Sequence, residues 1–153
     1  MDIYLDKIKS EDMKEVYKWH KDSNFLKYYD YYPPLDQDEE TVDKTFKYYE
    51  NSGKSKVFAV RKEGRIIGIG GFDDIIKDNQ VATLFIGFGN ENERGKGYGS
   101  KAMDLLLDYG FNKLKLHRIQ LNVLEFNQGA IALYEKFAFK KEGVFRDFVL
   151  RDD

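Results

Sequence analysis

The sequence lacks cysteine, carries only two prolines and contains no long apolar run. Without cysteine the chain has no disulfide, no thiolate metal site and no cysteine nucleophile. No apolar stretch approaches the roughly 20 residues that a helix needs to cross a bilayer. The N-terminal region is charged throughout, whereas a secretory signal would place an apolar core there. These absences predict a cytoplasmic protein with no membrane partner.

A large excess of charge of one sign is also missing. The 25 basic and 27 acidic side chains leave a net charge of -2, which gives no broad electrostatic footprint for nucleic acid. Aromatic residues, in contrast, make up 16% of the chain and supply bulky apolar material for a compact core. The 153 residues suffice for one such core and are too few for two ordinary domains, so we expect a single domain over residues 1–153.

The spacing of apolar residues predicts the element order β-α-α-β-β-β-α-β-α-β. Strands are expected at residues 3–8, in a hairpin over 56–72, and at 81–89, 117–124 and 142–150. Ser10 is the candidate cap of the first helix, Asp36 with Glu39 of the second, and Asn127 of the last. The two prolines interrupt the pattern between the first two helices, because proline cannot continue a helix.

Residues 95–99, which read G-K-G-Y-G, directly precede a strong helix pattern. A strand, a glycine-rich turn and a helix start together present consecutive backbone N–H groups to an anion. The spacing fits neither a Walker A loop nor the dinucleotide fingerprint G-x-G-x-x-G. Arg94 and Lys96 add positive charge at the rim of the turn. The turn therefore predicts an anion site of another kind, and a plain flexible turn is the alternative.

Two segments together resemble a known family. Arg94-x-x-Gly97-x-Gly99, followed further along the chain by "NQGAIALYEKFAF", is similar to the paired signature of the GNAT superfamily of acyl-CoA-dependent N-acyltransferases. The predicted element order matches that fold, an α/β (α+β) fold with a central mixed, mostly antiparallel sheet and helices on both faces. The segments "YKWHKD", "RGKGYGSKA" and "EGVFRD" look most like the branch that includes ribosomal-protein N-terminal acetyltransferases and spermidine acetyltransferases.

The resemblance implies where acetyl-CoA, the expected cosubstrate, would bind. In the family the pyrophosphate lies on the turn that here comprises Arg94, Gly95, Lys96, Gly97, Tyr98, Gly99 and Ser100. The pantetheine arm pairs with the strand that here contains Ile86 and Phe88, where that strand parts from the next. A main-chain N–H near Phe85 or Ile86 would polarise the thioester carbonyl. Asn127 matches the asparagine that contacts the coenzyme arm, and an ordinary helix cap is its alternative role. No metal is expected.

The resemblance also supplies candidate catalytic residues. Tyr134 matches the tyrosine proposed to protonate the departing thiolate, with packing in the core as its alternative role. An amine acceptor must lose a proton before attack, and Glu125 is the candidate base, with Asp73 as a second candidate. Both carboxylates also fit the description of solvated loop residues.

Three departures from the family pattern matter. Many relatives carry a glutamate at the position of Thr83, so a carboxylate that assists the acceptor is missing there. Ala138 stands where relatives have a glycine that ends a helix. Relatives also have a further strand beyond the one expected to end near Leu150, and this final strand is missing from the sequence.

The resemblance implies an enzyme that transfers acetyl from acetyl-CoA to a primary amine by direct attack. Protein N-termini and small amines, including polyamines, are both candidate acceptors. The aromatic residues at 28–32 and the acidic residues that follow them would suit a cationic amine, and a packed loop that leads to a negatively charged helix start is the alternative. The alternative is a non-catalytic module that binds acyl-CoA as a sensor or scaffold. We expect the protein to be a monomer or a homodimer.

Overall fold

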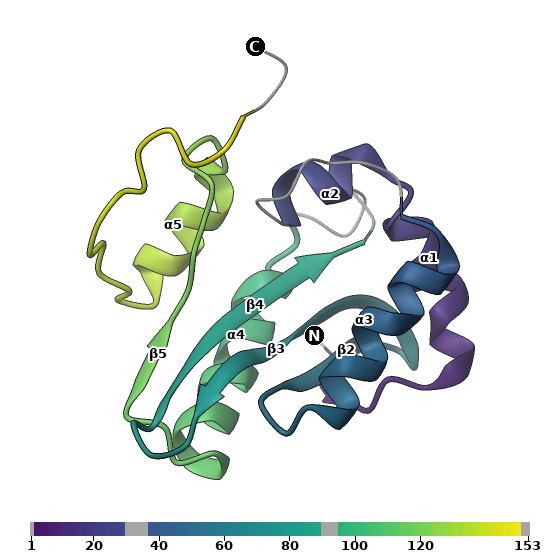
Figure 1. Ribbon diagram of the computed structural model, residues 1–153, viewed down its shortest axis with the longest axis horizontal. Helices are drawn as coiled ribbons and strands as arrows, with labels where there is room; N and C mark the ends of the chain where they lie inside the picture. Colours follow the sequence, from purple (N-terminus) through teal and green to yellow (C-terminus); the bar gives the residue numbers. More distant parts are fainter. Residues whose placement is uncertain (1, 30–36, 90–94, 151–153) are drawn as a thin grey trace.

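The computed structural model describes residues 2–29, 37–89 and 95–150. Its centre is a five-stranded sheet in the order β1-β2-β3-β4-β5 (Figure 1). The strands are β1 (Ile3–Asp6), β2 (Lys56–Lys62), β3 (Arg65–Ile76), β4 (Val81–Phe88) and β5 (Arg118–Gln120). Neighbours from β1 to β4 are antiparallel, and β5 runs parallel to β4. The sheet is therefore mixed and mostly antiparallel, which confirms the sequence prediction.

Helices cover both faces of this sheet. One face carries α1 (Met13–Trp19), α2 (Ser23–Tyr29) and α3 (Glu39–Asn51), which pack with the sheet through a cluster that includes Val16, Phe25, Val42 and Ile69. The other face carries α4 (Tyr98–Asp108), whose Met103 and Leu106 pack on Phe72 and Leu84. A 3-10 turn, η1 (Ser10–Asp12), leads into α1, and a π-helical turn, η3 (Tyr109–Lys113), extends α4. The helix α5 (Gln128–Lys136) lies beside the chain that follows β5 (Figure 1).

The β2–β3 hairpin forms where the sequence predicts it. Its turn residues Glu63 and Gly64 both have positive φ, at 52° and 79°. Such a turn matches the right-handed twist of paired strands, and glycine takes the second position without steric cost. The strand β3 continues past the predicted end at residue 72, as far as Ile76.

Two glycines of the β4 region make room for aromatic rings. A Cβ at Gly89 would fall inside the Trp19 indole, and one at Gly87 would lie 2.5 Å from the Tyr29 ring. Glycine within a strand predicts either a bulge or a close approach of another group to the backbone. Here the approaching groups are side chains of α1 and α2, which fix these helices against the end of β4.

The start of each N-terminal helix differs from the prediction. Ser10 is the first residue of η1 rather than a cap, and the Asp12 carboxylate instead accepts from the Lys9 N–H at 2.7 Å. At the start of α3 the Asp38 carboxylate accepts from the Thr41 N–H at 2.8 Å, while Asp36 lies outside the described residues. The acidic runs in the sequence offer several candidate caps, and the neighbouring backbone decides which one is used.

Within the described residues one helix was missed and two predicted strands are wrong. The helix α2 was not predicted, although Asp22, whose carboxylate accepts from the Asn24 N–H at 2.9 Å, is a signal for it. Only Arg118–Gln120 of the predicted strand 117–124 pairs, because β4 is its one neighbour and the two part after that point. Residues 142–150 form turns and irregular chain instead of a strand, and Phe145 is 71% exposed.

None of the described helices is long and apolar enough to cross a membrane.

Candidate active site between β4 and β5

The gap between β4 and β5 is the first element of the candidate site. The two strands pair at Val81, Ala82 and Thr83 of β4, opposite Arg118, Ile119 and Gln120 of β5. Beyond these pairs they part, and the chain after β5 leads away to α5 (Figure 1). No strand of the described chain pairs with residues 84–88 of β4 on this side. The splay that the family resemblance implies is therefore present.

The backbone of β4 alternates between β3 and this gap. The Gly89 N–H donates to the Ile67 carbonyl at 3.1 Å, so Gly89 points its amide towards β3. The carbonyls of Gly87 and Phe85 also lie against β3, because a Cβ on Gly68 or Gly70 would meet them. Successive residues of a strand direct their polar groups to opposite sides. The N–H and C=O groups of Ile86 and Phe88 therefore face the gap, where an extended ligand can pair with them.

The N-terminus of α4 is the second element. Gly97 caps this helix with φ of +80°, and it has no side chain to satisfy the first backbone N–H groups. Gly95 also has a positive φ of 73°, and a side chain added there would meet nothing within 4 Å. The exposed N–H groups and the helix dipole together favour an anion at this point. Arg94, expected at the rim of this turn, lies outside the described residues.

The remaining residues of this turn take different roles. Lys96 is exposed, whereas the Tyr98 side chain is buried beneath α4, with the Lys62 ammonium 5.0 Å from its ring centroid. Tyr98 therefore offers an anion its backbone only. A Cβ on Gly99 would lie 3.2 Å from Leu133, so this glycine allows close packing of α5 on α4.

A lysine that the sequence analysis missed lies at the same helix end. The Lys136 ammonium, on the last turn of α5, donates to the Ser100 hydroxyl oxygen at 3.0 Å. A cation beside the positive end of a helix is unfavourable unless an anion lies nearby. Neither the spacing nor the composition of α5 signals this contact, because it depends on how α5 packs on α4. The charge and the free N–H groups fit a phosphate group.

Tyr134 lies on α5, half-buried against the apolar cluster beneath the sheet. Its ring centroid is 5.9 Å from that of Phe139, in an edge-to-face arrangement. Within the described residues its hydroxyl has no hydrogen-bond partner. Burial raises the pKa of Tyr134 to about 12, because removal from water disfavours the phenolate. The phenol therefore stays protonated and able to donate, and it also packs in the core.

Asn127 is the N-cap of α5. Its side-chain oxygen accepts from the Ala130 N–H at 3.2 Å, which confirms the predicted cap. The amide nitrogen of Asn127 is not used by this cap, so its donors remain for another group.

The carboxylates are less clearly arranged. Glu125 is exposed in the turn before α5, and its backbone carbonyl accepts from the Gln128 side chain at 2.6 Å. Asp73 accepts from the Ser55 hydroxyl at 2.6 Å and lies opposite Thr83 in the β3–β4 register. Thr83 itself accepts from the Gln120 side chain at 3.3 Å. None of these contacts brings a carboxylate against Tyr134.

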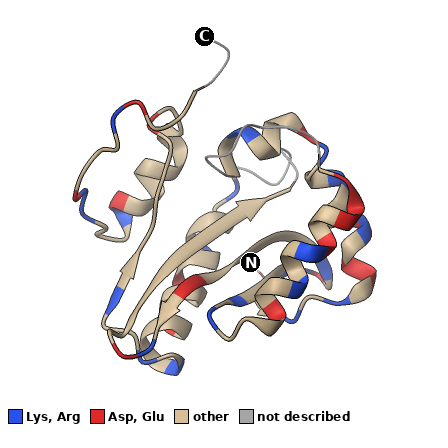
Figure 2. Cartoon of the chain, viewed as in Figure 1, with Lys and Arg blue, Asp and Glu red and all other residues tan. Residues whose placement is uncertain are grey.

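Charge is distributed around β4 rather than on it. Figure 2 shows β4 as an uncharged strand between the charged helices α1 and α3 on one side and the segment containing α5 on the other. Within the described chain, no three acidic or histidine side chains come close enough to hold a metal ion.

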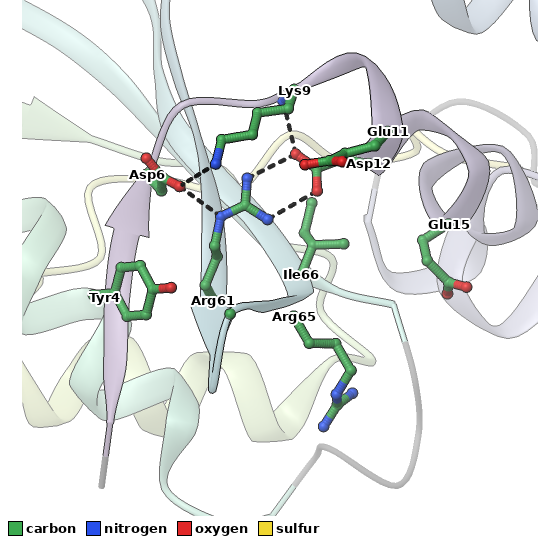
Figure 3. Close-up of a pocket in the computed structure, with 10 residues that line it drawn as sticks. Tyr4, Asp6, Lys9, Glu11, Asp12, Glu15, Arg61, Arg65 and Ile66 are labelled. Atoms are coloured by element: carbon green, nitrogen blue, oxygen red, sulfur yellow. Dashed lines mark hydrogen bonds and ion pairs between the residues drawn. The ribbon is translucent and has the colours of Figure 1, made fainter.

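A separate cavity of about 480 Å³ lies at the opposite edge of the sheet, near β1 and η1. Figure 3 shows the Arg61 guanidinium there, between Asp6 and Asp12. Arg61 is 4% exposed and donates to both Asp12 oxygens at 2.8 Å, to Asp6 at 2.7 Å and to the Lys7 carbonyl at 2.8 Å. Burial alone would raise the pKa of Asp12, but the bonds from Arg61 outweigh it and lower that pKa. This cluster joins η1 to the sheet and is distant from the gap.

Comparison with known proteins places this arrangement in a family. A model of the acetyltransferase (GNAT) domain matches residues 2–140. The chain is 27% identical over 141 residues to the spermidine N(1)-acetyltransferase of Escherichia coli (strain K12), with 92% of this chain and 74% of that protein covered. The solved spermidine N-acetyltransferase from Vibrio cholerae, in complex with CoA and spermine, superposes with a TM-score of 0.83 at 23% identity, over 92% of this chain and 82% of that one.

Higher identity is found over shorter segments. The chain is 38% identical over 89 residues to N-acetyltransferase p20 of Bacillus licheniformis, which covers 58% of this chain and 49% of that protein. A similar match to N-acetyltransferase YjcK of Bacillus subtilis covers 46% of that protein. These matches thus span about half the length of the two Bacillus relatives. With the signature turn at α4, the splayed strands and a domain model that covers most of its length, the chain belongs to the GNAT acetyltransferase family.

Proposed function

We propose that the chain transfers an acetyl group from acetyl-CoA to a primary amine by direct attack. One observation carries this proposal: the free backbone groups of Ile86 and Phe88 lie along the same gap that leads to the N-terminus of α4. This combination supplies a strand edge for an extended amide-containing arm and an anion site for the phosphates at its end. Residues of three separate segments thus fit different parts of one ligand.

Acetyl-CoA, when bound, supplies an activated acyl group and a thiol leaving group. The Gly95–Gly97 turn and Lys136 would hold the phosphates, and the Asn127 amide would donate to the arm. The Ile86 N–H faces the gap, and a fixed donor there would stabilise the charge that develops on the acyl oxygen. Tyr134, protonated because its pKa is raised to about 12, would donate a hydrogen bond to the departing sulfur.

The acceptor amine arrives mostly as ammonium and must lose a proton before it attacks. Thr83 cannot accept this proton, and the Asp73 carboxylate is already engaged by Ser55. Glu125 is exposed in the turn that leads into α5. We therefore assign the role of base to Glu125, acting directly or through a water molecule.

Small amines, including polyamines, are the acceptors that we favour. Several relatives are named spermidine acetyltransferases, among them those of Escherichia coli and Vibrio cholerae. The narrower branch that also includes ribosomal-protein N-terminal acetyltransferases stays a prediction, as do the single domain, the cytoplasmic location and a monomeric or dimeric state.

The test is release of free CoA by purified protein with acetyl-CoA and a panel of polyamines, monoamines and short peptides. Tyr134→Phe is the decisive variant, with the exposed Tyr48→Phe as its matched control. An enzyme should keep its affinity for CoA in Tyr134→Phe and lose turnover at least tenfold. CoA binding without release for any acceptor would favour the sensor role, and absence of CoA binding would overturn both.

A further inference from the structure

α2 and the turn before α5 lie near the end of β4, where the gap is open (Figure 1), and two aromatic rings meet between them. Tyr28 lies in the last turn of α2 and Phe126 in the turn before α5, with ring centroids 5.7 Å apart and planes inclined at 64°. Both are partly open to solvent, with exposed fractions of 38% and 39%. The Lys27 ammonium lies 5.6 Å from each centroid. A cation of the chain itself therefore occupies a site formed by two accessible rings.

The position of this ammonium follows from the rings alone. No carboxylate in the described residues lies within ion-pair distance of Lys27, although the sequence is rich in acidic side chains. The negative faces of aromatic rings attract a cation within about 6 Å of the centroid. The same attraction acts on any alkylammonium group that reaches this site. Glu125, which precedes Phe126 in the same turn, adds an exposed negative charge to the neighbourhood.

We propose that the Tyr28–Phe126 ring pair is a subsite for the second ammonium group of a polyamine, and that Lys27 occupies it in the free protein as an internal competitor. This inference rests on the proposed acetyl transfer to amines. A polyamine that places one nitrogen in the gap brings its next nitrogen to the rings and displaces Lys27. A monoamine has no second cation and leaves Lys27 in place.

The exposure of the rings determines how strongly Lys27 reduces the affinity for a polyamine. An exposed cation–π contact favours the occupied state by about two- to fivefold. Because a ligand must then bind the minor, vacated state, its apparent affinity is reduced by about three- to sixfold. Removal of the Lys27 charge should recover this factor for polyamines and leave monoamines unaffected.

The experiment compares Lys27→Met, Phe126→Leu and the double variant, with the exposed Lys113→Met as a control for net charge. Binding of spermidine and of butylamine is measured by calorimetry, with and without CoA. We expect Lys27→Met to bind spermidine about three- to sixfold more tightly and butylamine unchanged, with Lys113→Met like the wild type. The gain should vanish in the double variant, because the rings are then no longer paired.

Two results would overturn the subsite. Unchanged spermidine binding in Lys27→Met would show that Lys27 does not compete, and a gain that persists in the double variant would show general charge repulsion. Tyr28→Leu serves as the ring variant if Phe126→Leu does not fold. Release of CoA with butylamine tests acetyl transfer separately, so loss of turnover with every amine would refute the proposed function while the binding data still decide the subsite.

Discussion

Substitution of Lys136 by methionine tests the anion site at α4. The ammonium of Lys136 lies 3.0 Å from the Ser100 hydroxyl oxygen, beside the positive end of the helix. In the absence of ligand this charge is unfavourable by about 0.3–1 kcal/mol, so its removal should leave the free energy of unfolding unchanged or slightly increased. With a phosphate bound, two opposite charges about 4 Å apart attract by about 1 kcal/mol in water and about 4 kcal/mol near a protein surface. Because the site is exposed, we take the attraction between Lys136 and a bound phosphate as about 1–2 kcal/mol. We therefore expect Lys136→Met to bind CoA about five- to thirtyfold more weakly than the wild type.

The measurement is calorimetric binding of CoA at low and high salt, together with thermal unfolding of the free protein. Screening at high salt should reduce the difference between Lys136→Met and the wild type, because the attraction is electrostatic. The exposed Lys140→Met is the matched control, and it should bind CoA as the wild type does. Equal CoA affinity for Lys136→Met and the wild type would refute the reasoning. A lower melting temperature of the free variant would show instead that Lys136 is structural.

Other predictions concern titration, burial and packing. Burial raises the pKa of Tyr134 to about 12, so turnover should not decline on the alkaline side below about pH 11. A decline of turnover between pH 8 and 10 in the wild type that is absent from Tyr134→Phe would contradict this prediction. Arg61→Met leaves buried Asp12 unpaired and should lower the free energy of unfolding by about 3–5 kcal/mol in urea titrations, whereas a loss below 1 kcal/mol would mean that the cluster is dispensable. The pKa of Asp12 is lower in the folded state, so the wild type keeps the stabilisation from the Asp12–Arg61 pair above the ordinary pKa of 3.8 and loses it as the pH falls through the lower folded value. A free energy of unfolding that stays constant over this pH range would argue against a contribution from the pair. Gly89→Ala places a methyl group inside the Trp19 ring and should unfold the protein at a markedly lower temperature, and an unchanged melting temperature would show that α1 yields easily.

The sequence was sufficient for the strands β1 to β4 and for the turn before α4, because both are local patterns. Alternation predicted the β2–β3 hairpin, and the glycine-rich segment predicted the turn that leads into α4, where Gly97 has a positive φ. The failure at residues 142–150 has a different cause. Alternating apolar residues predict a strand only where a neighbouring strand is available, and within the described residues none pairs with this segment. Periodicity therefore records the capacity for pairing rather than the pairing itself.

The parts of the site that the sequence analysis missed depend on contacts between distant segments. Lys136 reaches Ser100 only because α5 packs on α4, and Lys27 meets Phe126 only because the fold brings α2 close to the turn before α5. A cation site was one of two interpretations of the aromatic run at 28–32, and Tyr28, one of its two described residues, already holds a cation from the chain itself. Residue types thus predicted the kind of interaction, and the fold determined its partner.

The short pairing between β4 and β5 has a mechanical consequence. The segment that contains α5 has no fully buried residue in its helix and is joined to the sheet through three β5 pairs. An extended ligand in the gap would bond to β4 on one side and touch this segment on the other. It would therefore stabilise the packing of the α5 segment against the sheet. The local opening free energy of α5 then rises with ligand concentration as RT ln(1 + [L]/Kd). Slower hydrogen exchange of the α5 amides would consequently report occupancy even for a ligand that never reacts.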